Sequence, residues 1–156
     1  MNTRWLKQLG YGLIFILVQI LMFRHLKLFN MQADLLLIYV VWVIANDNRT
    51  NAITLAAVLG FIHDFLMDTW GLHMFTKTFI AFAAFNFIPR YSEIRLPSGQ
   101  VFFAILGIGL IHNIVFIGVA NFIDAFAESV FFWRHWIGNS IYTAIVGMLL
   151  YLFKAD

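Results

Sequence analysis

The chain has 156 residues, of which 62% are hydrophobic and only 12% are charged, and its formal net charge is +2. Soluble domains typically carry about 25% charged residues, so this composition excludes a water-soluble globular surface and indicates an integral membrane protein. The absence of cysteine excludes disulfides and thiolate chemistry, and so small a charge without a basic cluster argues against nucleic-acid binding.

Six apolar runs follow one another along the chain, and each approaches the roughly 20 residues that a helix needs to cross the hydrocarbon core. The sequence therefore predicts an all-α integral membrane protein, a bundle of six transmembrane helices that forms a single domain over residues 1–156. No small-residue cleavage site follows the first run, so we expect it to remain as a helix. The expected spans are residues 9–23, 31–45, 52–67, 73–88, 101–123 and 136–153.

The second and third runs are short, and a re-entrant pair of half-helices is an alternative to two full spans. We expect two spans, because the polar turn between them, residues 46–51, would be costly at mid-membrane. Six spans place both termini on one side of the membrane. Basic residues divide six to four in favour of that side, which predicts cytoplasmic termini.

The third run combines a ridge of small residues with two carboxylates. Ala52, Ala56 and Gly60 recur every four residues and lead to Asp64 and then Asp68 on the same predicted face. Small residues at this spacing let another helix backbone approach closely. We expect Asp64 to form hydrogen bonds inside the bundle, and Asp68 to cap the fourth helix or face water. The alternative is that Asp64 holds a partner group, a proton or a cation.

The segment after the third run contains a turn and a lysine. Gly71 can adopt a positive φ and sharpen the turn into the fourth helix. Lys77 is expected either to pair with Asp64 or Asp68 or to extend its ammonium group toward the membrane surface. The histidines and aspartates of residues 63–73 lack the paired spacing of a zinc helix such as HExxH, so no metal or other cofactor is expected.

The fifth run carries a polar pair, His112 and Asn113, near its middle. Polar side chains at such a depth usually point into the bundle and form hydrogen bonds with a neighbouring helix, and a ligand site or proton relay is the alternative. The sequence contains no G-x-S-x-G, no phosphate-binding loop and no Cys–His pair, so we expect no enzymatic activity.

Three stretches together resemble the MreD family, the small membrane subunit of the bacterial cell-elongation machinery. They are Asp-Leu-Leu-Leu-Ile-Tyr-Val at 34–40, Leu-Gly-Phe-Ile-His-Asp at 59–64 and Asp-Thr-Trp-Gly-Leu-His at 68–73. In a short protein with six predicted helices, their order and spacing resemble members of the family, especially Bacteroidota-like ones. Gln32-Ala33 stands where the family often has a proline before the second helix, which leaves the start of that helix open.

The resemblance implies a non-enzymatic scaffold in the bacterial cytoplasmic (inner) membrane. Such a protein would bind the membrane helix of MreC and act with the RodA glycosyltransferase, its transpeptidase and, indirectly, the MreB filament in peptidoglycan synthesis and cell-shape control. The residues expected to pack against a partner or to shape the outer end of the bundle are Ala52, Ala56, Gly60, Asp64, Asp68, Gly71 and His73.

The resemblance also implies a fold similar to the substrate-binding subunits of energy-coupling-factor vitamin transporters. A small-molecule carrier is therefore the alternative function, with a polar pocket lined by Asp64, Asp68, Asn86 and His112. A third possibility is a proton or cation path through Asp64 and His112.

Overall fold

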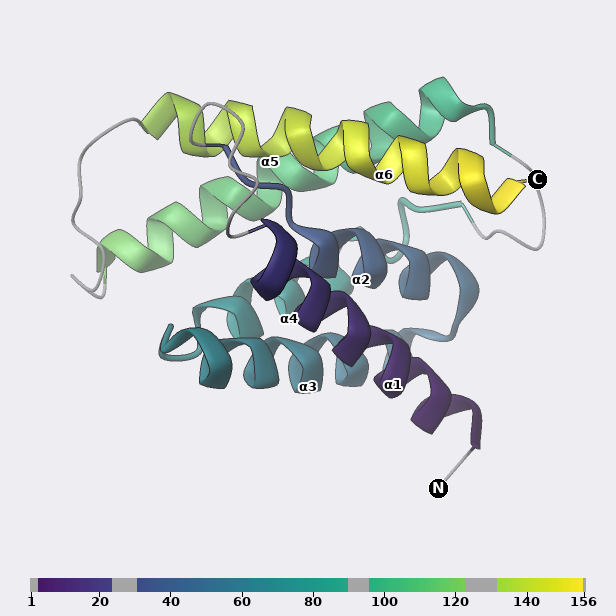
Figure 1. Cartoon of the computed structure of the whole chain (residues 1–156), viewed down its shortest axis with the longest axis horizontal. Coiled ribbons are helices and arrows are strands. Elements are labelled where there is room, and N and C mark those ends of the chain that lie inside the picture. Colours follow the sequence, from purple (N-terminus) through teal and green to yellow (C-terminus); the bar gives the residue numbers. More distant parts are fainter. Residues whose placement is uncertain (1–2, 24–30, 90–95, 123–131, 156) are drawn as a thin grey trace.

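The computed structural model describes residues 3–23, 31–89, 96–122 and 132–155. Every regular element in these ranges is helical, and each expected apolar run contains a helix (Figure 1). Elements η1 and η2 are π-helical turns that adjoin α1 and α6. The elements in chain order are α1 Thr3–Val18, η1 Gln19–Phe23, α2 Leu35–Asn46, α3 Arg49–Met67, α4 Leu72–Ala84, α5 Ser98–Phe122, η2 Arg134–Gly138 and α6 Asn139–Ala155.

The helices differ in whether they can cross a membrane. By length and composition, three helices among the described residues can do so: Arg49–Met67, Ser98–Phe122 and His135–Phe153. Helix α2 has 12 residues and α4 has 13, so each rises only about 18–20 Å against a hydrocarbon core of about 30 Å. The expected bundle of six spans is therefore not confirmed, because the second and fourth runs form helices shorter than the hydrocarbon core, whereas the third run has the length of a span.

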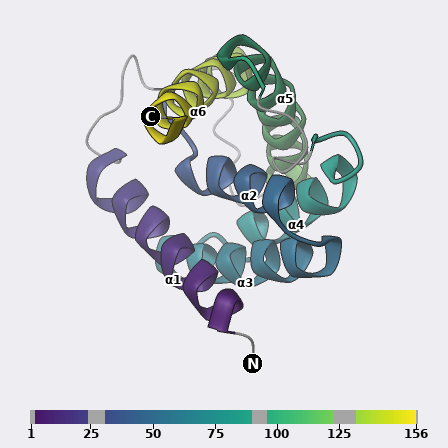
Figure 2. The ribbon, with the colours of Figure 1, turned by 90° about the vertical axis from the view of Figure 1, so that its right-hand side faces the viewer.

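Helix α2 occupies the centre of the molecule. It packs against α1, α3, α4, α5 and α6, and nine of its 12 residues are buried. The end-on view in Figure 2 shows α2 between the α5–α6 pair and the α3–α4 pair, with α1 along one side. A helix that is apolar all round has no face suited to water, so burial on every side is what its sequence requires.

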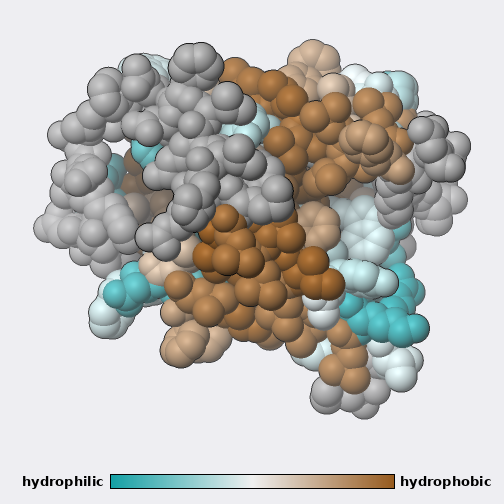
Figure 3. Space-filling view, viewed as in Figure 1, coloured by the Kyte–Doolittle hydropathy of each residue, from teal (hydrophilic) through white to brown (hydrophobic). Residues whose placement is uncertain are grey.

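The outer surface of the bundle is apolar. Large exposed hydrophobic side chains come from α1, α3, α4, α5 and α6, and examples are Leu17, Phe65, Phe82 and Phe103. Figure 3 shows a hydrophobic band across the middle of the molecule, with hydrophilic residues toward its two ends. So much exposed apolar surface matches a lipid environment rather than water.

A polar cluster ties α1 to the turn between α2 and α3. Gln8 Nε2 donates a hydrogen bond of 2.8 Å to Asp47 Oδ2, while the backbone N–H of Asn48 and the amide of Asn51 donate to Oδ1 at 2.7 and 3.2 Å. The Arg4 guanidinium lies 3.9 Å from the same carboxylate. Burial raises the pKa of Asp47, but the hydrogen bonds and the Arg4 charge outweigh it and hold that pKa below its ordinary value.

Because its pKa is lowered by folding, the Asp47 carboxylate stabilises the fold above the ordinary value of 3.8, and this contribution is lost as the pH falls through the lowered pKa. We expect Asp47→Asn to cost roughly 1–2 kcal/mol at pH 7, and the difference from wild type to shrink below about pH 4. Thermal unfolding in detergent, followed by tryptophan fluorescence at both pH values, measures this. Asp68→Asn, at an exposed position, is the control, and a gap that widens toward acid contradicts the assignment.

Candidate functional site

The turn between α3 and α4 has left-handed backbone at three of its four residues. The angle φ is 56° at Asp68, 50° at Trp70 and 87° at Gly71. Glycine adopts this region without steric cost, so the expected role of Gly71 in the turn is confirmed. Asp68 ends α3 here and is exposed, so it does not share a helix face with the buried Asp64.

Asp64 supplies the cap that this turn lacks. Gly71 is the N-cap residue of α4 and has no side chain to accept hydrogen bonds from the first turn. Instead, Asp64 Oδ1 accepts from the backbone N–H of His73 at 2.9 Å and from the Thr69 hydroxyl, while Oδ2 accepts from the N–H of Met74 at 2.8 Å. The expectation that Asp64 forms hydrogen bonds inside the bundle is confirmed, and its role is to fix the start of α4.

The ridge of small residues faces inward. Ala52 and Ala56 are each 1% exposed, and Gly60 is buried where α3 meets the start of α4. A Cβ atom on Gly60 would lie 2.6 Å from Met74 Cα and 2.8 Å from the backbone oxygen of His73. The ridge does allow close packing, but of the chain's own helices, so it offers no exposed face to a partner helix.

Gly60→Ala should therefore force α3 and α4 apart, since the clashing atoms are backbone and cannot rotate away. We expect a loss of about 1–3 kcal/mol, typical of overpacking, measured as a lower unfolding temperature in detergent. Gly107→Ala is the matched control, because a Cβ there meets nothing within 4 Å. Equal unfolding temperatures for the two variants would show that α3 and α4 are not in close contact.

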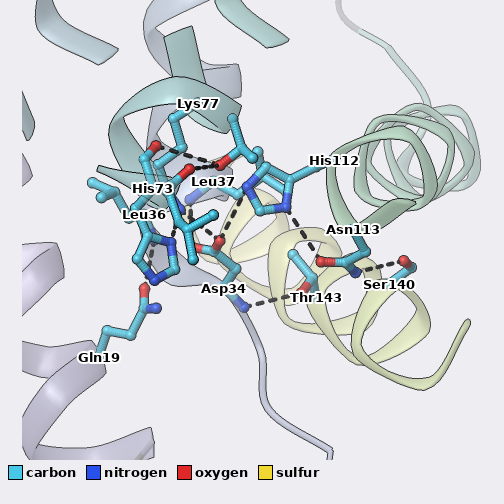
Figure 4. A network of polar contacts seen from close by, with 12 residues as sticks. Gln19, Asp34, Leu36, Leu37, His73, Lys77, His112, Asn113, Ser140 and Thr143 are labelled. Atoms are coloured by element: carbon cyan, nitrogen blue, oxygen red, sulfur yellow. Dashed lines mark hydrogen bonds and ion pairs between the residues drawn. The ribbon is translucent and has the colours of Figure 1, made fainter. Parts of the chain in front are cut away.

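The start of α2 lies inside the bundle, where its free N–H groups need acceptors (Figure 4). Asp34 is the N-cap residue, and its Oδ1 accepts from the N–H of Leu37 at 2.9 Å. Gln19 Oε1, from η1, accepts from the N–H of Leu36 at 2.9 Å. The backbone N–H of Asp34 itself donates to Thr143 Oγ1 of α6 at 3.0 Å. Three separate segments therefore meet at this helix end.

Lys77 of α4 places a positive charge beside the Asp34 carboxylate. Its Nζ lies 2.8 Å from Asp34 Oδ2, and its side chain is 0% exposed against 16% for that of Asp34. The expectations that Lys77 pairs with Asp64 or Asp68, or extends to the membrane surface, are both wrong. A buried ammonium group needs a compensating charge, and Asp34 lies within reach whereas Asp64 is already occupied by the start of α4.

His112 of α5 approaches the same carboxylate from the other side. Its Nε2 lies 3.8 Å from Asp34 Oδ2 and has no hydrogen-bond partner among the described residues. Its Nδ1 faces Asn113 Oδ1 at 3.2 Å, and the amide nitrogen of Asn113 donates to Ser140 Oγ at 2.8 Å and toward the carbonyl of Trp136. A carbonyl only accepts, so this orientation of Asn113 assigns the proton of neutral His112 to Nδ1.

Two further histidines complete the cluster. His73 Nδ1 lies 3.2 Å from Lys77 Nζ, and because an ammonium group only donates, this nitrogen is the acceptor. The ring of the buried His63 packs against that of His73, with 4.1 Å between the two ring centroids. In the described ranges no three His, Cys, Asp or Glu side chains form a group that could hold a metal ion. Lys77 lies between His73 and Asp34, and its charge would repel a cation there.

The buried charge cluster is defined as Asp34, Lys77, His63, His73 and His112. The expected roles of His112 and Asn113 as interior groups that join helices are confirmed, but the Asp34–Lys77 pair was not foreseen. The sequence holds only a partial indication of it, because it does not identify which carboxylate meets Lys77. Asp34 and Lys77 lie within apolar runs and carry opposite charges, and such residues usually pair with one another.

Removing one partner of the Asp34–Lys77 pair should leave the other buried and uncompensated. We expect Lys77→Met to cost about 3–5 kcal/mol, and Asp34→Asn with Lys77→Met to cost less than the two single changes added together. Unfolding temperatures of the wild type, both single variants and the double variant give the coupling, with the exposed Lys7→Met as control. Strict additivity would mean that the two charges do not interact.

The chain matches no protein-family model, no curated protein and no solved structure.

Proposed function

We propose that this chain is an MreD-like, non-enzymatic scaffold of the bacterial cell-elongation complex. It would be a multi-pass protein of the cytoplasmic membrane with both termini in the cytoplasm. It would bind the membrane helix of MreC, and through MreC act with the RodA glycosyltransferase, its transpeptidase and the MreB filament. The three stretches that resemble the MreD family motivate this proposal.

One structural observation supports a scaffold over a carrier: the interior ionisable groups are directed at the chain's own helices. Asp34 caps α2 and pairs with Lys77, and Asp64 caps α4. The side chains named for a carrier pocket are dispersed, because Asp68 and Asn86 are exposed beyond opposite ends of α4 while His112 is buried beside Asp34 at the start of α2. Charges used in this way stabilise an arrangement of helices rather than recognise a ligand.

The partner surface must then be sought on an outward face. Helix α5 offers Gly107 and Gly118, where an added Cβ atom would meet nothing within 4 Å, beside the exposed Ile111 and Ile114. These four positions recur at intervals of four, three and four residues, so they share one face of the helix. Small residues on a lipid-facing helix allow the close approach on which helix pairing in membranes depends.

Co-expression with a tagged MreC that retains its membrane helix tests the proposal. We expect the chain to co-purify with it, and not with a version that lacks that helix. Gly107→Leu should reduce recovery several-fold by blocking close approach, whereas Gly10→Leu on α1, where a Cβ also meets nothing within 4 Å, should not.

The outcomes separate the two functions. Failure of the wild-type chain to co-purify contradicts the scaffold proposal, and equal recovery of both leucine variants removes α5 as the contact while leaving the scaffold intact. A metabolite that stays bound through purification and is released on denaturation would favour the carrier instead.

A further inference from the structure

A shallow apolar groove runs along the outer surface between α3 and α4. It has a volume of about 230 Å³ and is lined by Ile53 of α3 and by Phe75, Thr78, Phe79 and Phe82 of α4. The Thr78 hydroxyl donates to the backbone oxygen of Met74 at 2.6 Å, so it presents no unsatisfied polar group to the groove. The groove is therefore suited to a hydrocarbon chain.

A cation lies at one end of this groove. Arg49, the first residue of α3, is exposed, and its Cζ lies 4.6 Å from the centroid of the Phe82 ring. Across the described part of the chain, no carboxylate lies within 4.0 Å of its guanidinium. Asp47, which precedes it in the turn, is engaged by Gln8 and lies near Arg4. The charge of Arg49 is thus uncompensated by the described residues.

The cation and the groove are arranged along the helix axis. From Phe82 to Phe75 is seven residues of α4, or about 10 Å, leading away from Arg49 toward the start of that helix. Arg49 itself belongs to the polar end formed by the α2–α3 turn, and the groove leads from it along apolar residues of α4. A positive group at the polar end, followed by an apolar groove, matches the polarity of one phospholipid. Its phosphate would lie at the guanidinium and an acyl chain would lie in the groove.

We propose that Arg49 and this groove bind an anionic phospholipid, with its headgroup at the guanidinium and one acyl chain along Phe82, Phe79 and Phe75. Basic groups beside membrane helices attract anionic headgroups, and the guanidinium suits phosphate geometry. Inorganic phosphate would contact Arg49 but not the groove, and a lipid without net charge would fill the groove but leave the charge of Arg49 uncompensated. This site is separate from the buried charge cluster and from the proposed contact on α5.

Native mass spectrometry of the full chain, delipidated in detergent and titrated with phosphatidylglycerol or phosphatidylcholine of identical chains, tests the site. We expect wild type to bind phosphatidylglycerol about five-fold more tightly. Arg49→Gln should bring the two lipids to near parity by weakening only phosphatidylglycerol. Thr78→Trp, which fills the groove, should weaken both lipids.

Arg4→Gln is the matched control, because Arg4 lies at the same polar end but donates to the backbone oxygen of Asn46 at 3.0 Å and lies near Asp47. It should retain the wild-type preference. Three results would overturn the proposal: equal binding of both lipids to wild type, equal losses in Arg4→Gln and Arg49→Gln, or undiminished binding of both lipids to Thr78→Trp. Arg49 is exposed, so Arg49→Gln should fold normally, and its lipid preference alone tests whether Arg49 binds the anionic headgroup.

Discussion

The structure depends on satisfying a helix end that lies inside an apolar bundle. In lipid, a backbone N–H without an acceptor costs several kcal/mol, so an irregular segment is tolerated only where protein surrounds it. Here the acceptors for the start of α2 come from Asp34 and from Gln19 of η1. The segment that leads to that end is held by α6, where Asn139 Oδ1 accepts from the N–H of Gln32 at 2.9 Å. The capping carboxylate introduces a negative charge that needs its own compensation, and Lys77 provides it from α4.

As a consequence, the backbone hydrogen bonds, the ion pair and the helix packing at the centre of the molecule all depend on the start of α2. Replacing such a pair with apolar residues is often tolerated energetically, so its effect here is better described as fixing which helices meet than as adding net stability. In such a molecule, polar contacts fix how the helices are arranged in the interior. The exposed Phe, Leu and Ile side chains of the outer surface are free to contact lipid or other helices.

Local chemistry could be predicted from the sequence, and long-range pairing could not. The helices follow from the apolar runs, the bend at Gly71 from glycine's freedom at positive φ, and the inward direction of Asp64 from the cost of exposing a carboxylate to hydrocarbon. The pairing of Asp34 with Lys77 joins residues 43 positions apart and depends on how α2 and α4 cross, which no local pattern records. Small residues such as Gly60 indicate that another helix backbone packs closely, but not whether that helix belongs to the same chain or to a partner. The length of α2 is overestimated from the sequence because hydrophobicity continues before Asp34, although aspartate is a preferred N-cap residue and marks the true boundary.

The position of α2 also constrains how the chain is made. Residues 31–46 are synthesised before Lys77 and Thr143, yet Lys77 supplies the charge that compensates Asp34, and Thr143 supplies the acceptor for its backbone N–H. Until α6 is synthesised, the backbone N–H groups of Asp34 and Gln32 are without their final partners. The polar contacts at the centre of the molecule are therefore completed only after α6 has been synthesised.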